Sequence, residues 1–73
     1  LKKISIPKSV KELGRGAFGE CYNLTDIYFE SPDCEGLEDS GIVGQSRTVY
    51  APVGGNVEAF CNKHPMLTFI PVN

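Results

Sequence analysis

Short segments in which apolar and polar residues alternate recur at almost constant spacing along the chain. Residues 1–6 read LKKISI, and residues 24–29 read LTDIYF, 23 positions later. A weaker copy follows at residues 48–52. Alternation with a period of two is typical of a half-buried β-strand, and a sequence period in the twenties is typical of a solenoid. Each solenoid unit buries its apolar face by stacking on a neighbour, so the pattern predicts an α/β repeat solenoid.

The repeat divides the chain into one partial domain of three units. They are residues 1–23, an irregular second unit 24–47, and a terminal unit 48–73 with a strand, a helix and a last strand. Three or four short strands are expected, at residues 3–6, 26–29, 48–51 and 67–70. The register of the last strand has two alternatives, because either Leu67 and Phe69 or Thr68 and Ile70 can face inward.

A short helix is predicted over residues 57–63. Its apolar residues recur at helical spacing on one face, namely Val57, Phe60 and Cys61. Asn56 is expected to cap the N-terminus with its side chain, and Pro65 ends the helix. We expect this helix to shield the last unit as a short C-terminal capping helix.

The segments between strands are expected to return along the opposite, convex side of each unit. In the first unit the apolar residues available for this are Val10, Leu13, Ala17 and Phe18, followed by Cys21 as a small buried residue. In the second, acidic segment they are Leu37, Ile42 and Val43. The pattern therefore predicts two layers, with strands on one side and these return segments on the other.

Residues 14–19 contain the pattern G-x-G-x-x-G, which is also found in nucleotide-binding loops of protein kinases. A kinase also needs a lysine on a following strand, yet no lysine occurs between Lys11 and Lys63. The His-Arg-Asp and Asp-Phe-Gly motifs are absent from the sequence as well. The glycines fit the tight turns of a return segment equally well, so we expect no nucleotide and no other cofactor.

Composition and charge narrow the function further. The chain has 73 residues, 41% hydrophobic and 22% charged, which is typical of a globular chain rather than a disordered one. Its net charge of −2 gives no general attraction for nucleic acid, and no apolar run is long enough for a membrane span. Because the chain opens within a strand pattern, without methionine or a signal peptide, we expect it to be a piece of a longer protein.

The three cysteines and the single histidine are the candidate ligands or nucleophiles. Cys21, Cys34, Cys61 and His64 could in principle make a four-ligand zinc site, but no C-x-x-C spacing is present. Cys61 and His64 are three residues apart and could meet on the helix as a thiol and base. A disulfide at Cys34 remains open, although free thiols are the expectation. We expect no metal site and no catalytic residue.

Residues of the first unit and the first residue of the second unit together match one longer pattern. They are Leu1, Ile4, Ile6, Pro7, Ser9, Val10, Leu13, Gly14, Ala17, Phe18, Cys21 and Leu24. Written as L-x-x-I-x-I-P-x-S-V-x-x-L-G-x-x-A-F-x-x-C-x-x-L, this pattern resembles the BspA-type leucine-rich repeat. The terminal unit resembles the ending of such arrays through Val49, Tyr50, Pro52, Val57, Glu58, Ala59 and Phe60. Residues 30–44 depart from the pattern, because the second unit lacks the Ala-Phe and Cys positions.

The resemblance implies a right-handed coil with a small parallel sheet on its concave face. It also implies a bacterial or protozoan protein that is secreted or held at the cell surface. Members of the family bind host, matrix or microbial surface proteins and have no enzymatic activity in their repeats. The corresponding expectation is a non-enzymatic adhesion module at the C-terminal end of a longer array.

Alternation places five residues outward on the sheet, where a protein partner could bind: Lys3, Ser5, Asp26, Tyr28 and Tyr50. Ser5, Tyr28 and Tyr50 are expected to align in one row across three strands. A second hypothesis is that the chain is only a structural cap with no ligand of its own. In either case the N-terminal coil has no neighbour to cover it, so self-association through that coil is expected.

Overall fold

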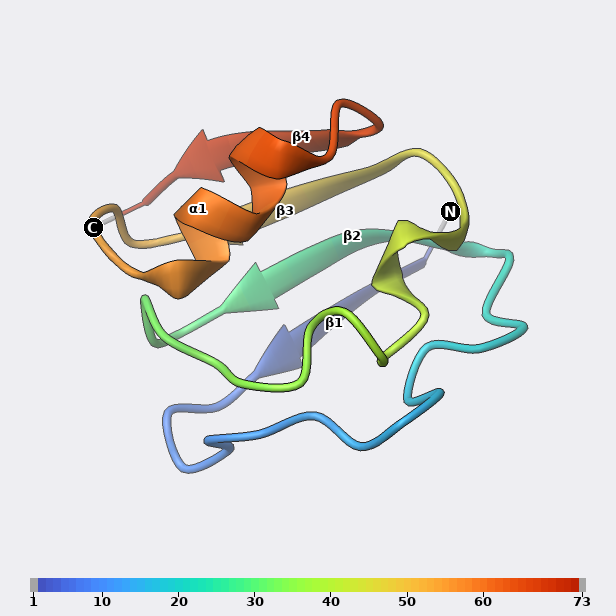
Figure 1. Cartoon of the computed structure of the whole chain (residues 1–73), viewed down its shortest axis with the longest axis horizontal. Coiled ribbons are helices and arrows are strands. Elements are labelled where there is room, and N and C mark those ends of the chain that lie inside the picture. The colour runs from blue at the N-terminus through green and yellow to red at the C-terminus, as the bar shows by residue number, and fades with distance from the viewer. Residues whose placement is uncertain (1, 73) are drawn as a thin grey trace.

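The computed structural model describes residues 2–72. The elements follow in the order β1 (Lys2–Ile6), β2 (Leu24–Phe29), the 3-10 turn η1 (Ile42–Gly44), β3 (Arg47–Ala51), α1 (Asn56–Lys63) and β4 (Leu67–Pro71) (Figure 1). All neighbouring strand pairs are parallel, and the strand order is β1-β2-β3-β4. The predicted small parallel sheet and short helix are confirmed, with each strand one or two residues longer than expected.

The strand register places one apolar row on the inner face of the sheet. Ile4 pairs with Ile27, Ile27 with Val49, and Val49 with Phe69. Leu67 is buried whereas Ile70 is 39% exposed, so Leu67 and Phe69 face inward in β4. Of the two registers that the sequence allowed, β4 therefore adopts the one with Leu67 and Phe69 on the inner face.

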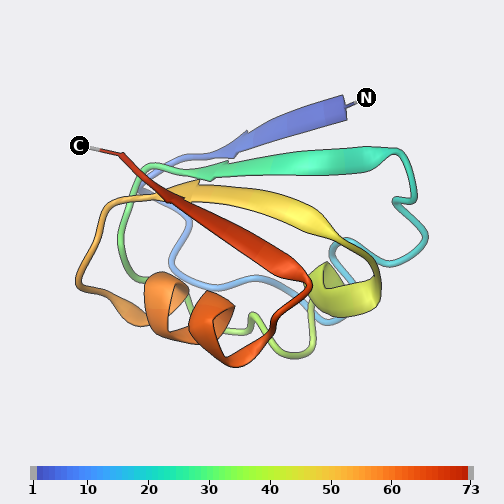
Figure 2. The same ribbon diagram turned by 90° about the horizontal axis from the view of Figure 1, so that it is seen from above.

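The sheet forms one layer, and α1, η1 and the return segments form the other (Figure 2). The largest fully buried side chains lie between the layers and come from strands, η1 and helix alike: Phe29, Ile27, Ile42, Val49 and Val57. Each contributes about 1.5–3 kcal/mol by leaving water. No helix or strand of residues 2–72 covers the opposite face of the sheet, which stays open (Figure 2).

The first return segment buries Leu13 and Phe18, as predicted. Ala17 is exposed, because successive tight turns between Gly14 and Gly19 rotate it to the surface, so its predicted place in the core was wrong. Cys21 is half-buried. Leu13 and Phe18 are therefore the two large apolar side chains that this segment buries in the core.

The second return segment supplies the core residues that its sequence suggested. Leu37 and Ile42 are buried, and Val43 packs against the core. Its backbone also runs alongside the first segment, where the Leu13 N–H donates to the Glu35 carbonyl at 2.9 Å and the Glu35 N–H donates to the Lys11 carbonyl at 3.0 Å. Two segments 22–24 residues apart are therefore joined by backbone hydrogen bonds on the side opposite the sheet.

Asn56 does not cap α1 as predicted, because it is the first helical residue and Gly55 occupies the cap position. Its side chain reaches the second return segment, where Oδ1 accepts the Cys34 N–H at 2.8 Å and Nδ2 donates to Glu35 Oε2 at 2.9 Å. A Cβ at position 55 would collide with the carbonyl of Pro32. The local capping rule failed because Asn56 fastens the helix to a segment 21–22 residues earlier.

Arg47 is a charged residue whose role the sequence pattern did not predict, and it is 4% exposed. Nε donates to the Leu24 carbonyl at 2.8 Å, and one terminal nitrogen donates to the Gly41 and Ile42 carbonyls at 3.0 and 2.6 Å. The other terminal nitrogen donates to the Cys21 carbonyl at 3.0 Å. One guanidinium thus satisfies four backbone acceptors at the corners where the return segments lead into β2 and β3.

Candidate binding face

The structure brings the five proposed binding residues onto the open face of the sheet. Ser5 lies opposite Tyr28, and Tyr28 lies opposite Tyr50, so the predicted row across β1, β2 and β3 is present. Lys3 lies opposite Asp26 in a second row. The open face therefore carries one row centred on two phenol rings and a parallel row with one cation and one carboxylate.

The two tyrosine rings lie against each other. Their centroids are 6.1 Å apart and the ring planes differ by 22°, so the rings are stacked across neighbouring strands. Tyr28 is 39% exposed and Tyr50 is half-buried. Part of each ring stabilises the sheet by this contact, and part of the pair remains accessible to a partner.

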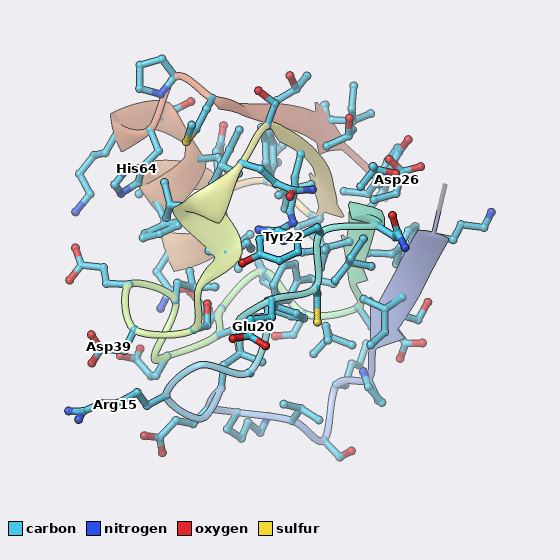
Figure 3. The ribbon with its side chains drawn as sticks, turned by 90° about the vertical axis from the view of Figure 1, so that its right-hand side faces the viewer. Arg15, Glu20, Tyr22, Asp26, Asp39 and His64 are labelled. Atoms are coloured by element: carbon cyan, nitrogen blue, oxygen red, sulfur yellow. The ribbon has the colours of Figure 1, made fainter. Side chains whose placement is uncertain are left out.

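A shallow hollow of about 270 Å³ opens beside the tyrosines and is lined by Lys3, Asp26, Tyr28 and Tyr50. In the part of the chain that the structure describes, neither Lys3 nor Asp26 forms an ion pair or a side-chain hydrogen bond. Figure 3 places Asp26 on the side of the sheet opposite His64 and α1. Both charged groups are therefore available to a ligand on this face.

Three further residues of this face were not among the predicted site residues. Thr48 pairs with Asp26 and with Thr68, and Ile70 pairs with Tyr50, so they extend the two rows onto β3 and β4. Thr68 and Ile70 could have been found by choosing the register that buries Leu67. Thr48 could have been found from the alternation within the third segment, which also points Tyr50 outward.

The comparisons with known proteins add no relative from which a role for this face could be transferred. No model of a known protein family, no curated protein and no solved structure matches the chain. The chemistry of the face therefore rests on its own residues.

The glycine-rich segment has already used the backbone amides that a phosphate would need. The Gly16 N–H donates to the Asp39 carbonyl at 2.7 Å, and the Phe18 N–H donates to the Ser40 carbonyl at 2.6 Å. The Gly19 N–H donates to the Gly16 carbonyl at 2.9 Å. A nucleotide-binding loop instead directs such amides toward the ligand. The same residues therefore fasten the first return segment to the second.

Cys61, the candidate nucleophile beside His64, is not activated. Burial raises the pKa of the Cys61 thiol to about 11, so at neutral pH it is the protonated thiol rather than the reactive thiolate. The His64 ring packs on Phe60, with centroids 4.4 Å apart. Burial, helped by Glu35 and Glu12, also raises the pKa of Cys34. Cys21, Cys34 and Cys61 are free, and no cluster of three or more metal ligands occurs among residues 2–72.

The single helix of residues 2–72 is far too short to cross a lipid bilayer, and no other described helical segment could do so. It packs against β3 and β4 instead and buries Val57, Phe60 and Cys61. The helix is therefore part of the core layer behind the candidate face.

Proposed function

We propose that this chain is a segment of a BspA-type leucine-rich-repeat array, secreted or held at a cell surface, whose open sheet face binds a protein partner without catalysis. The observation that carries the proposal is the row of Ser5, Tyr28 and Tyr50 across three parallel strands. Strands at a spacing of 22–23 residues that stack in register are what a repeat array of this kind requires.

The chemistry of the open face supports binding. Tyrosine is enriched among the residues that dominate protein interfaces, because a rigid ring buries a large area at small entropic cost. Here the ring pair stands beside an unpaired carboxylate and an unpaired ammonium group, on a face that no described element covers. An enzymatic function lacks comparable support, since Cys61 is protonated and the glycine-rich amides are engaged.

A second candidate function is that of a structural cap without a ligand. It is favoured by α1, whose buried Val57, Phe60 and Cys61 close the core behind β3 and β4. Terminal units of this kind keep the last coil of a repeat array away from water. The two functions are compatible, because the cap uses the inner layer and the binding site uses the open face.

Replacing Tyr28 and Tyr50 together with serine is expected to weaken binding to a protein partner by at least about 30-fold, the effect of losing an interface hot spot. The free energy of unfolding should fall by about 2 kcal/mol, because the variant loses one aromatic pair and the buried part of two rings. Binding can be measured on immobilised collagen, laminin and fibronectin, and stability by urea denaturation. Met66→Ser is the control, since Met66 is 42% exposed and lies outside the strands that carry the tyrosines.

Undiminished binding by the folded fraction of the double variant, whatever its change in Tm, would contradict the binding role. The tyrosines would then serve the sheet alone, and the cap would be the better account. Equal loss of binding in Met66→Ser would also count against the open face, because it would show that binding depends on exposed apolar side chains anywhere.

We also propose that the chain associates with itself through its N-terminal coil. Ile4 is 42% exposed although its partner Ile27 in β2 is fully buried, and β1 is an edge strand with an unpaired ladder. A hollow of about 380 Å³ beside Ile4 extends along the loop into β2 and includes Cys21, Tyr22 and Leu24. The inner apolar row therefore continues to a surface that another coil could cover.

Ile4→Ser is expected to shift association to at least about 10-fold higher concentration while the fold is kept, because Ile4 is 42% exposed already and lies on an edge strand. Sedimentation velocity over a wide concentration range measures the effect. Val53→Ser is the control, since Val53 is 59% exposed and lies outside β1. If the chain without any substitution stayed monomeric at millimolar concentration, the proposal would be contradicted.

A further inference from the structure

We infer that the hollow on the open face binds one pyranose ring of a neutral glycan carried by the protein partner. The inference rests on the proposed function, because it names the ligand of the same face. Its basis is the set of four lining residues, Lys3, Asp26, Tyr28 and Tyr50, which combine aromatic surface with one cation and one anion.

The tyrosine pair supplies the apolar surface that a sugar ring needs. A pyranose ring has one or two faces on which C–H groups predominate, and the negative face of an aromatic ring attracts such groups. Tyr28 is 39% exposed, and its stacking on Tyr50 holds the pair in a fixed orientation. The stacking uses one face of each ring, so a sugar ring would lie against the exposed part of Tyr28 that lines the hollow.

The polar groups of the hollow match the hydroxyls of a sugar. Asp26 is acceptor-only when ionised, and Lys3 is donor-only, whereas each sugar hydroxyl can both donate and accept. The two side chains lie opposite each other on β1 and β2, yet they form no ion pair within 4.0 Å in the described chain. Their formal charges cancel, so the hollow favours a neutral ligand with both donors and acceptors over an anion or a cation.

The size and surroundings of the hollow set the extent of the ligand. Its volume of about 270 Å³ lies just below the roughly 300–1,000 Å³ of drug-sized ligand pockets, which suits a single ring. Short hydroxyl side chains adjoin it at Ser5, Thr48 and Thr68, so the face beside it is low and polar. A longer glycan could therefore continue along Thr48 and Thr68, whereas Ile70 stands in the neighbouring row beside Tyr50.

The first experiment titrates ¹⁵N-labelled protein with the methyl glycosides of mannose, galactose, glucose and N-acetylglucosamine. At least one glycoside is expected to cause saturable shifts in the amide signals around Asp26, Tyr28 and Tyr50, with a Kd on the order of millimolar. Tyr28→Ser and Asp26→Ala should each abolish saturation below about 100 mM ligand. Asp39→Ala, which alters an exposed residue away from the hollow, should leave the shifts unchanged.

Absence of saturable shifts with all four glycosides would overturn the inference. Saturable shifts at the same residues with arginine amide, but with none of the sugars, would overturn it as well and would assign the hollow to a basic peptide side chain. Shifts that persist in Tyr28→Ser would place the sugar elsewhere and so would also refute it.

A second experiment separates this inference from the proposed function. Binding to immobilised laminin and fibronectin is measured before and after enzymatic removal of their glycans. We expect binding to fall at least about 10-fold after deglycosylation. Undiminished binding that still depends on Tyr28 and Tyr50 would leave protein binding intact and overturn the glycan assignment. No binding at all, together with no sugar-induced shifts, would overturn both.

Discussion

Replacing Arg47 with methionine is expected to lower the free energy of unfolding by about 2–4 kcal/mol, because the hydrogen bonds of a buried charged donor are lost. The guanidinium holds the carbonyls of Cys21, Leu24, Gly41 and Ile42, and methionine can fill its volume but can donate to none of them. The Cys21, Gly41 and Leu24 carbonyls keep another donor in the Leu24 N–H, the Gly44 N–H and Gln45 Nε2. The cost is therefore mainly that of the lost hydrogen bonds to a charged group, which contribute about 1.5–3 kcal/mol each at most. Urea denaturation followed by far-UV circular dichroism measures the loss.

Arg47→Lys and Arg15→Met test the origin of this effect. A lysine ammonium group keeps the charge but cannot reproduce the planar fork of donors, so Arg47→Lys should recover less than half of the loss. Arg15 is exposed, and Arg15→Met should change stability by less than about 0.5 kcal/mol. If Arg47→Met unfolded at the same urea concentration as Arg15→Met, the four hydrogen bonds would add nothing to the stability of the fold.

Replacing Gly36 with alanine is expected to cost about 2–4 kcal/mol, from two causes that act at one residue. Gly36 has φ +80°, a backbone conformation that L-residues rarely adopt, and an added Cβ would collide with the Leu13 carbonyl. The collision falls where the two return segments are joined by hydrogen bonds between residues 11–13 and Glu35. Alanine would therefore both strain the chain and separate these segments. Thermal and urea unfolding of the variant measure the loss.

Two glycines of the first unit, Gly16 and Gly14, make it possible to separate the backbone strain from the collision. Gly16 has φ +70° but open space around its Cα, so Gly16→Ala should cost only the conformational strain of about 1–2 kcal/mol. Gly14 has neither feature, so Gly14→Ala should be neutral or slightly stabilising. Equal stability of Gly36→Ala and Gly16→Ala would show that the return segments yield to the extra methyl group.

The sequence was sufficient for elements whose signal is periodic. Alternation located the strands, and the spacing of 22–23 residues correctly predicted that Ser5, Tyr28 and Tyr50 share one row. Helical spacing identified the buried face of α1 through Val57, Phe60 and Cys61. The strands and the buried face of α1 follow from the order of residues within one element. The row across three strands follows from the constant length of the repeat.

Features that depend on partners in another segment were missed. The four acceptors of Arg47 lie 5–26 residues earlier and converge only when the return segments turn, so the sequence shows just one more charge. Asn56 satisfied the local rule for a helix cap, but its side chain bonds to Cys34 and Glu35 instead. The hollow beside Asp26 could not be predicted either, because it depends on Lys3 and Asp26 standing opposite each other without pairing.

The parallel strand order has a mechanical consequence for a chain that is pulled from both ends. The chain enters β1 at one end of the sheet and leaves β4 at the other end, and β1 and β4 are the two edge strands (Figure 1). Tension therefore acts along the strands in opposite directions and loads their hydrogen bonds in shear. Neighbouring bonds must then yield together, whereas a hairpin pulled at its open end unzips one bond at a time. The two tyrosines lie on β2 and β3, between these edge strands, so the pair would keep its geometry until the inner strands slip past each other.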